Sequence, residues 1–318
     1  MSRIDLLAEC AGASRVAVSA HIRPDGDAVG SCMALYYYLK KAMPGTEIRV
    51  LLEKPADIFR DLKWIECVDS SFEYAGTFDV FFALDTAKER LGGAEKFFES
   101  AGKTINIDHH ISNGAGCADV NVVIPHASST SEVLYELMEE ELLDEDIAKA
   151  LYIGIIHDCG VFQYSNTSPR TMEIGAKLIG YGLPFSKLIE ETFYQKNYVQ
   201  SQIMGRALME SVRFMDDRCI VSCVSRKMMD FYEAKPSDLD GIVNQLRNIK
   251  GVDCAIFMYE TGTMEYKVSL RSNECVDVSK VAAFFGGGGH MRAAGCTMNG
   301  TFHDVVNNLS RQIEEQLY

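Results

Sequence analysis

Short apolar runs alternate with longer amphipathic segments through the first half of the chain. The apolar runs predict strands at residues 16–20, 47–52, 79–84, 103–107 and 120–124. Between them, residues 28–41 and 87–100 have helical patterns, and two more helices are expected between residues 128 and 157. Strands that alternate with helices are typical of a parallel sheet. The first half is therefore predicted to be an α/β domain, a parallel sheet with helices on both faces.

Polar residues mark where the last two of these helices are expected to begin. Ser129, Thr130 and Ser131 are alternative N-caps for the first of the two, and Asp144 is the expected cap of the second. Side chains of these types accept hydrogen bonds from the free N–H groups of a first helical turn. The pattern does not decide among the three candidates at residues 129–131.

The pattern changes beyond residue 160. Residues 161–212 look mostly helical, and residues 194–212 are predicted to form a long connecting helix. Strands are then expected at residues 219–224, 254–259 and 265–270, with a further strand of small residues after a glycine run. Helices are expected at residues 237–248, 278–283 and 302–317. We predict an α/β domain at residues 1–187, a helical linker at 188–212 and a smaller α+β domain at 213–318.

Length and composition fit a globular protein of two domains. The chain has 318 residues, of which 47% are apolar and 24% are charged, as is ordinary for globular proteins. No run approaches the roughly 20 apolar residues of a membrane helix. The first ten residues include Asp5 and Glu9 and lack the basic start and apolar core of a signal peptide. We expect a cytoplasmic protein that has no membrane partner.

Cysteine content and net charge narrow the classes further. The ten cysteines are spread thinly and form no CxxC pair, which favours reduced thiols over a disulfide framework. The net charge of −14 argues against a protein that binds long nucleic acid through a broad basic surface. It is compatible with a metal site, because cations neutralise a cluster of acids.

Four separate segments of the first half place carboxylates or imidazoles directly after a predicted strand or at the end of a helix. Ligands of open α/β sheets bind at the carboxyl ends of the strands, so these side chains should converge. A single Asp after a strand is usually a turn or cap residue, but four segments that end this way favour one shared site. The candidate metal ligands are His21, Asp25, Asp27, Asp85, His109 and Asp158.

Converging carboxylates repel one another unless cations compensate their charge. Mixed carboxylate and imidazole ligands suit Mn²⁺, with iron, cobalt or zinc as alternatives, whereas oxygen ligands alone would favour Mg²⁺ or Ca²⁺. Six side chains are enough for two cations with one bridging carboxylate. Two such cations serve phosphoryl hydrolysis by clamping the attacking and the leaving oxygen. The sequence thus predicts a phosphoesterase with two Mn²⁺ per chain; Mg²⁺, Co²⁺ and Fe²⁺ stay open as alternatives.

These residues resemble the motifs of the DHH phosphoesterase superfamily. The run Asp108-His109-His110 is similar to the motif that names it, and residues 21–28, Asp85 and residues 157–162 resemble its first, second and fourth motifs. Residues 286–290 and 293–295 are similar to the DHH-associated substrate domain. The match spans nearly the whole chain. Within the superfamily, the chain looks most like the bacterial branch of nanoRNases and phosphatases of 3′-phosphoadenosine 5′-phosphate (pAp).

The resemblance implies a role for each residue. One metal would be held by His21, Asp25 and Asp85, and the other by Asp27, Asp85, His109 and Asp158, with Asp85 as the bridge. His110 would contact the scissile phosphate, and Asp108 would orient a histidine.

Two positions depart from the family pattern, which usually has Thr there. His157 is expected either to adjust the surroundings of the ligands or to face away from them. Cys159 is expected to be a small buried thiol in place of a hydroxyl.

The second domain offers groups for a phosphate. Gly288 and Gly289, in a run of four glycines before His290, provide backbone that can approach an anion closely; a flexible surface loop is the alternative interpretation. Arg271 and Ser272 follow the strand at residues 265–270, and a guanidinium suits phosphate. Arg292 is a further candidate.

The leading hypothesis is hydrolysis of short oligoribonucleotides, together with removal of a phosphate from pAp. The partners expected are short oligonucleotides or small nucleotides, with no long nucleic acid. Hydrolysis of a cyclic or linear signalling dinucleotide and hydrolysis of pyrophosphate are enzymatic alternatives. A nucleotide-binding regulator without turnover is an alternative of another class. A homodimer is compatible with the sequence but does not follow from it.

Overall fold

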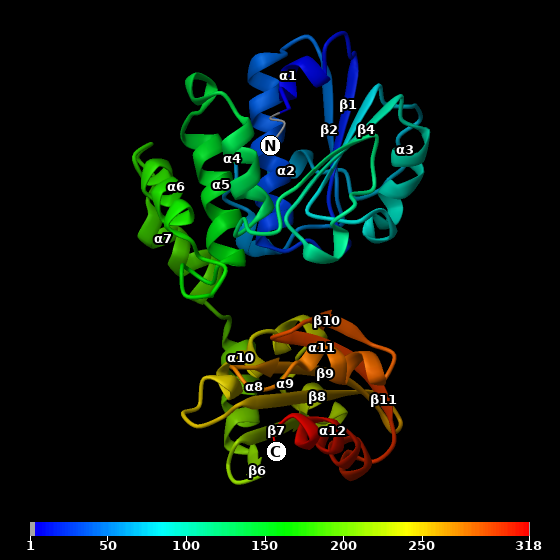
Figure 1. The fold of residues 1–318 in the computed structure, drawn as a ribbon, viewed down its shortest axis with the longest axis vertical. Coiled ribbons are helices and arrows are strands. Elements are labelled where there is room, and N and C mark those ends of the chain that lie inside the picture. The colour runs from blue at the N-terminus through cyan, green and yellow to red at the C-terminus, as the bar shows by residue number, and fades with distance from the viewer. Residues whose placement is uncertain (1–3, 318) are drawn as a thin grey trace. The chain divides into compact units, whose positions relative to one another are not determined.

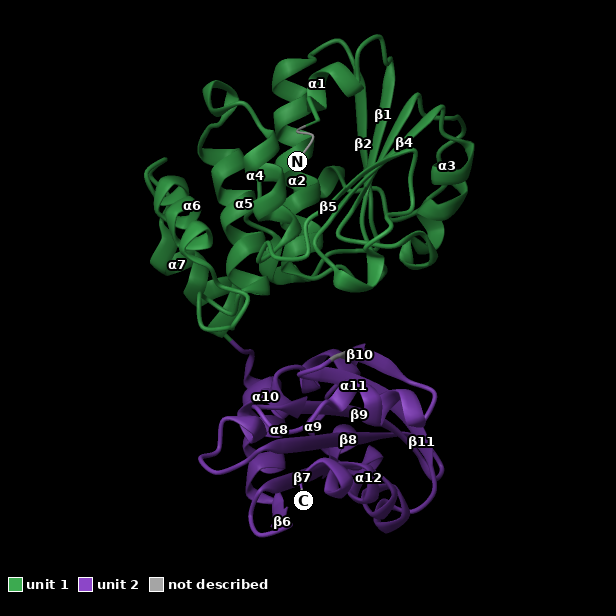
Figure 2. Cartoon of the chain, in the orientation of Figure 1, with its two compact units in different colours: residues 1–195 green, residues 196–318 purple. Residues whose placement is uncertain are grey.

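The computed structural model describes residues 4–317, including every side chain in that range except that of His290. The chain divides into two compact units, Met1–Gln195 and Lys196–Tyr318 (Figure 2). Within the described range, no helix combines the length and the apolar character needed to span a bilayer.

The first unit is built on the parallel sheet that the sequence predicts (Figure 1). All neighbouring strands are parallel, in the order β2-β1-β3-β4-β5. The central strand is buried at every residue, as expected for a strand that is covered on both faces. The strands are β1 (Arg15–Ser19), β2 (Glu47–Leu51), β3 (Val80–Leu84), β4 (Lys103–Asp108) and β5 (Val120–Val123).

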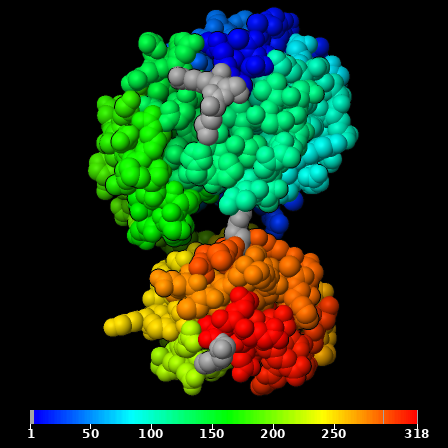
Figure 3. Space-filling model, in the orientation of Figure 1, coloured from blue at the N-terminus to red at the C-terminus, as the bar shows by residue number. Residues whose placement is uncertain are grey.

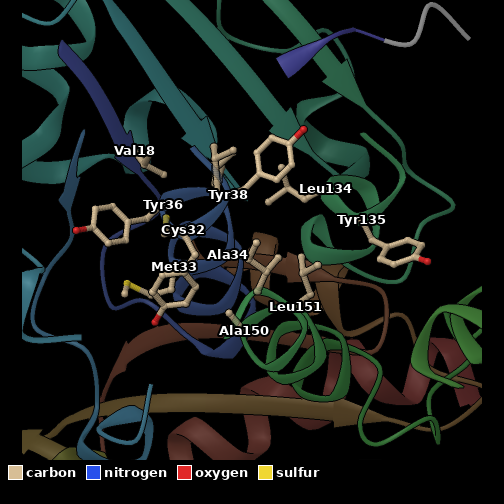
Figure 4. Close-up of a cluster of buried hydrophobic side chains, with 14 of the residues drawn as sticks. Val18, Cys32, Met33, Ala34, Tyr36, Tyr38, Leu134, Tyr135, Ala150 and Leu151 are labelled. Atoms are coloured by element: carbon tan, nitrogen blue, oxygen red, sulfur yellow. The ribbon is translucent and has the colours of Figure 1, made fainter. Parts of the chain in front are cut away.

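Most helices of the first unit lie on one face of this sheet. A large apolar core joins them to the strands, and Figure 4 shows Val18, Leu134 and Leu151 within it. Ser129 is the cap of α4, and Asp144 caps α5 as predicted. The helices are α1 (Leu6–Glu9), α2 (Gly26–Ala42), α4 (Thr130–Leu137), α5 (Glu145–Asp158), α6 (Pro169–Ile179) and α7 (Phe185–Ile189).

The opposite face of the sheet is covered by α3 (Glu95–Ser100) and by the segment that leads into this helix. Phe81 from β3 packs there against Phe98. The helix predicted at residues 87–100 forms only at its C-terminal end. Its first part consists of two single turns of 3-10 helix, Lys88–Arg90 and Gly92–Ala94, because Gly92 has a φ of +56°, which no α-helix accommodates.

The second unit is the predicted smaller α+β unit. Its six strands follow the order β10-β11-β9-β8-β7-β6, and β7 and β8 are its one parallel pair among the described strands. The strands are β6 (Val212–Phe214), β7 (Cys219–Val224), β8 (Cys254–Gly262), β9 (Glu265–Ser272), β10 (Gly288–His290) and β11 (Ala293–Asn299). The helices are α8 (Tyr198–Met209), α9 (Arg226–Tyr232), α10 (Ile242–Arg247), α11 (Val278–Phe284) and α12 (Phe302–Leu317).

Two helices of this region are shorter than predicted. The long helix expected at residues 194–212 is α8 alone, because Asn197 caps its start in a reciprocal pair with Gln200. A π-helix, Glu190–Tyr194, precedes it. Gly241, with φ +88°, separates α10 from the 3-10 helix Pro236–Leu239. The last helix, α12, has the predicted length, and Figure 3 shows its outer face in red.

Candidate metal centre

The six predicted ligands converge beyond the carboxyl ends of β1, β3 and β4. Their ligand atoms form two groups, and the atoms of each group lie within 4.8 Å of one another. Both groups match the predicted sets, except that Asp85 is absent from the second. The first group is His21, Asp25 and Asp85, and the second is Asp27, His109 and Asp158. A third group, Asp85 with His109 and His110, overlaps both of these.

Asp85 lies between the two groups. Its Oδ2 is 3.4 Å from Nε2 of His21, and its Oδ1 is 3.6 Å from Nε2 of His109. The residue is buried and has a left-handed backbone with φ +54°, while its N–H still donates to the Ile107 carbonyl at 3.0 Å. The two carboxylate oxygens therefore face different groups, as the oxygens of a bridging ligand would.

The histidines of the two groups are oriented through their other ring nitrogen. Nδ1 of His21 lies 2.8 Å from the Ile22 carbonyl oxygen, and Nδ1 of His109 lies 3.3 Å from that of Ala127. A backbone carbonyl at Nδ1 favours the tautomer that offers Nε2 to a cation. Nε2 of His109 is buried and has no hydrogen bond to any described residue, although an Asp158 oxygen is 2.9 Å away. An unsatisfied nitrogen beside a carboxylate fits a pair of metal ligands.

The charges in the centre also fit divalent cations. Burial, together with the nearby carboxylates Asp85 and Asp158, raises the pKa of Asp27 well above its usual value. Burial also raises the pKa of Asp85. For His21 and His109 burial opposes protonation, but the carboxylates beside them outweigh it and raise each pKa to about 10. The buried carboxylates can therefore be ionised together only if nearby positive charge compensates them, and divalent cations would supply that charge.

The first turn of α4 holds Asp27. The Asp27 carboxylate is fully buried and accepts hydrogen bonds from the backbone N–H of Thr130 at 2.6 Å, from that of Ser131 at 3.0 Å and from the Ser131 hydroxyl at 2.6 Å. The Thr130 hydroxyl donates to Oδ1 of Asp85 at 3.2 Å. From the sequence, Thr130 and Ser131 are expected only as possible helix caps, and no local pattern indicates these contacts with Asp27 and Asp85.

Asp108 and His110 form a fixed pair at the end of β4. Oδ1 of the buried Asp108 lies 2.8 Å from Nδ1 of His110 and also accepts both backbone N–H groups of His109 and His110. Its Oδ2 accepts from Asn113 at 2.7 Å, and Asn113 in turn donates to Asn106. Neither asparagine is predicted as a site residue from the sequence, where the one signal is a polar Asn106 within a buried strand. Asp108 can therefore orient His110.

His157 lies against the start of α2, next to Gly26. A Cβ on Gly26 would lie 2.1 Å from Cγ of His157, so the imidazole packs on the backbone between Asp25 and Asp27. Its Nε2 is 3.1 Å from the Thr192 hydroxyl, and its ring is 5.3 Å from that of Phe59. His157 thus packs against the start of α2 and lies in none of the groups of candidate ligands among the described residues.

Cys159 is a buried thiol that accepts a hydrogen bond from the backbone N–H of Phe162 at 3.2 Å. Burial raises the pKa of this thiol to about 11. A neutral thiol is a poor metal ligand, and Cys159 lies in none of the three groups of candidate ligands.

The candidate phosphate-binding residues lie in the second unit. Strand register pairs His290 with Ala293, and Ala293 with Arg271. These backbone positions therefore lie in one row across the sheet, with β11 between the edge strand β10 and the end of β9. The side chain of His290 lies outside the described residues. A Cβ on Gly289 would lie 2.5 Å from the Ala293 carbonyl oxygen, whereas Gly288 borders open space.

The two predicted residues at the end of β9 are partly or fully buried. Arg271 donates from Nε to Oδ1 of Asn244 at 3.1 Å. Ser272 is buried, and its hydroxyl donates to the Met291 carbonyl at 3.4 Å. Arg292 donates to the Val276 carbonyl at 3.2 Å. The guanidinium of Arg271 is thus held at a fixed position in the sheet.

Family models match both units. The model described as "DHH family, N-terminal domain" matches residues 15–155, and the "DHHA1 domain" model matches residues 216–318. A relative from Thermus thermophilus named "Bifunctional oligoribonuclease and PAP phosphatase NrnA" is 30% identical over 89% of this chain and 84% of its own length. A relative of the same name from Bacillus subtilis is 28% identical over 87% of each chain.

A solved structure has the same fold. The crystal structure of an exopolyphosphatase-related protein from Bacteroides fragilis has a TM-score of 0.87 and is 24% identical, and the match covers 99% of this chain and 96% of that one. Its similarity in fold extends over both units. The Thermus thermophilus relative and the two family models show that the chain belongs to the DHH family and carries a DHHA1 domain.

Proposed function

We propose that this protein is a metal-dependent phosphoesterase that hydrolyses short oligoribonucleotides and removes a phosphate from pAp. The observation that carries the proposal is the pair of ligand groups on either side of Asp85. The names of the Thermus thermophilus and Bacillus subtilis relatives, both oligoribonuclease and PAP phosphatase, support the choice of substrates.

The donor atoms favour Mn²⁺ as the native metal, because imidazoles and carboxylates contribute together. One cation would be held by His21, Asp25 and Asp85, and the other by Asp27, Asp85, His109 and Asp158. When bound, such a pair supplies positive charge and a water-derived nucleophile near neutral pH.

His110 is the proposed residue for contact with the scissile phosphate. Burial opposes protonation of its imidazole, but Asp108 and Asp85 outweigh burial and raise the pKa of His110. A raised pKa favours the protonated imidazole, which can donate a hydrogen bond to a phosphate oxygen or a proton to the leaving oxygen. Asp108 fixes the ring through Nδ1, so this donation would come from Nε2.

The charge distribution supports short substrates. The first unit has 17 basic and 30 acidic residues, and the second has 14 basic and 15 acidic residues. A protein that binds a long nucleic acid neutralises many phosphates with Lys and Arg, and neither unit has an excess of them. We propose that Arg271, Ser272, His290 and the backbone of Gly288 and Gly289 receive a terminal phosphate or nucleotide.

Cysteine chemistry supports action in the cytoplasm. All ten cysteines are free thiols, and six of them, among them Cys10 and Cys254, are buried. Thiols of this number persist in a reducing compartment.

A panel of substrates tests the proposal. The purified protein is incubated with Mn²⁺ and with pAp, a dinucleotide, a longer oligoribonucleotide, a cyclic dinucleotide or pyrophosphate. We expect turnover of the dinucleotide and of pAp, with slower turnover of the longer oligomer. Turnover limited to the cyclic dinucleotide or to pyrophosphate, or binding of nucleotides without product, would contradict it.

A further inference from the structure

The first turn of α4 connects two carboxylates from different strands. Thr130 and Ser131 are fully buried. Thr130 donates to Asp27 through its backbone N–H and to Asp85 through its hydroxyl, while Ser131 donates to Asp27 through both of its donors. Four hydrogen bonds from one helical turn thus fix two side chains that come from distant parts of the chain.

We propose that Thr130 and Ser131 are positioning residues that set the affinity of the centre for its cations. Ser131 would act on the group of Asp27, His109 and Asp158, and Thr130 would act on the bridging Asp85 as well. This inference rests on the proposed metal-dependent function. Hydrogen bonds to a ligating carboxylate fix its orientation, and loss of such partners typically weakens metal binding by about 10–100-fold.

The hydroxyl of Ser131 has a site built for it. Gly154 of α5 lies opposite, where a Cβ would be 1.9 Å from Oγ of Ser131 and 2.7 Å from Oδ1 of Asp27. Only glycine leaves the space that the serine hydroxyl and the carboxylate share. The packing of α2, α4 and α5 therefore leaves room for the hydrogen bond from the Ser131 hydroxyl to Asp27.

The two residues should differ in what they control. The hydroxyl of Ser131 contacts Asp27 at 2.6 Å, and Asp27 belongs to one ligand group only. The hydroxyl of Thr130 contacts Oδ1 of Asp85, the carboxylate that lies between both groups. Loss of the serine hydroxyl should therefore weaken one cation, and loss of the threonine hydroxyl should weaken both.

The test is a Mn²⁺ titration of the full chain, in which free Mn²⁺ is measured by electron paramagnetic resonance. Ser131→Ala should raise one of two dissociation constants about 10–100-fold and leave the other unchanged. Thr130→Val should raise both, whereas Thr130→Ser, which keeps the hydroxyl, should bind like the natural protein. If Ser131→Ala fails to fold, the comparison of the two Thr130 variants decides.

Ser128→Ala is the matched control. Its buried hydroxyl lies directly before α4 and donates to Glu132 at 2.6 Å, not to a candidate ligand. We expect it to lower thermal stability without a change in either dissociation constant. Unchanged Mn²⁺ binding in Ser131→Ala and Thr130→Val, or equal weakening in Ser128→Ala, would overturn the inference. If the natural protein bound no Mn²⁺, the proposed function would fail instead.

Discussion

Asp85 combines two features that cost free energy. A left-handed backbone at a residue other than glycine costs roughly 1–3 kcal/mol, and a buried carboxylate costs several kcal/mol unless it is paired. Asp85 has φ +54° and is 2% exposed. The imidazoles and the Thr130 hydroxyl beside it compensate the burial of its charge only in part. Such strain at a junction of two ligand groups points to a residue kept for chemistry rather than for stability.

Replacement of Asp85 by Ala should therefore abolish hydrolysis while the fold survives. We expect at least about a 10³-fold loss of kcat/KM, on the scale of losing an essential catalytic group, with an unfolding midpoint equal to or above that of the natural protein. Enzyme assays with Mn²⁺ and thermal unfolding measure both quantities.

Asp79→Ala is the control from the other end of the same strand. The Asp79 carboxylate accepts the backbone N–H groups of Ser14 and Arg15 at 2.8 and 2.9 Å. This variant should lose stability and keep its activity. Near-normal turnover by Asp85→Ala would contradict the bridging role.

Metal binding should release protons. In the metal-free protein His21 and His109 hold their protons up to a pKa of about 10, and Asp27 also has a raised pKa. Ligands must lose these protons before they bind a cation, so affinity should rise as pH increases from 6 to 8. Calorimetry in buffers of different ionisation enthalpy measures the release; Mn²⁺ binding that releases no proton at pH 7 would contradict these pKa directions.

The predicted ligands follow from the sequence because each lies close after a recognisable strand or at one end of a recognisable helix. Their hydrogen-bond partners do not follow, because contacts such as Ser131 to Asp27 depend on how α4 packs against α2 and α5. The role of Asn113 was equally hidden, since it arises from a turn after His110 that no local pattern marks. Sequence thus predicts which segments meet, and packing decides which atoms do.

At the scale of elements, the contact between α2 and α5 positions several ligands of the candidate metal centre. Asp25 and Asp27 lie at the start of α2, and Asp158 ends α5. The two helices approach closely at Gly30, where a Cβ would lie 2.5 Å from the Ala150 carbonyl oxygen and 2.8 Å from the Gly154 nitrogen. These atoms belong to the backbone of α5, so they cannot rotate away from an added methyl group as a side chain could. Gly30 therefore allows the short separation of the two helices.

Gly30→Ala should accordingly destabilise the protein by about 1–3 kcal/mol through overpacking, although alanine favours a helix over glycine. It should also weaken Mn²⁺ binding, because α5 carries Asp158. Urea unfolding and Mn²⁺ titration check the two effects. Gly45→Ala is the control, since its Cβ would meet no atom within 4 Å; it should be neutral or slightly stabilising. Equal stability of the two variants would be evidence against the close contact.

The elements that sequence mispredicted share a physical cause. Residues 87–100 and 194–212 contain helical spacing, but Gly92 takes a positive φ and Asn197 starts a new helix with its own cap. Local backbone and capping preferences overrode the apolar spacing at both places. Regular segments without such interruptions, among them β3 and α12, match their prediction.

At the scale of the whole molecule, the two units differ in net charge and in their candidate functional groups. The first unit holds the ligand groups and most of the negative charge, and the second is nearly neutral. The division favours a substrate that needs few phosphate contacts. Sequence predicted the two architectures because the pattern of strands and helices changes along the chain, but the short edge strand β6 was too brief to be recognised.

Arg271→Ala should weaken substrate capture without altering the metal content. Loss of hydrogen bonds from a charged group costs about 1.5–3 kcal/mol, so KM for pAp should rise about tenfold or more, with kcat little changed. Steady-state kinetics and metal analysis measure these. Lys267→Ala removes a positive charge from the same strand and should leave KM unchanged. Loss of metal in Arg271→Ala would show that the residue has been given the wrong role.

The most direct test of the central claim is a crystal structure of the protein grown with Mn²⁺, with anomalous data collected near the manganese edge. Two anomalous peaks on either side of Asp85 are expected, one beside His21 and Asp25 and the other beside Asp27, His109 and Asp158. An absence of peaks there, or peaks bound by other residues, would contradict the account.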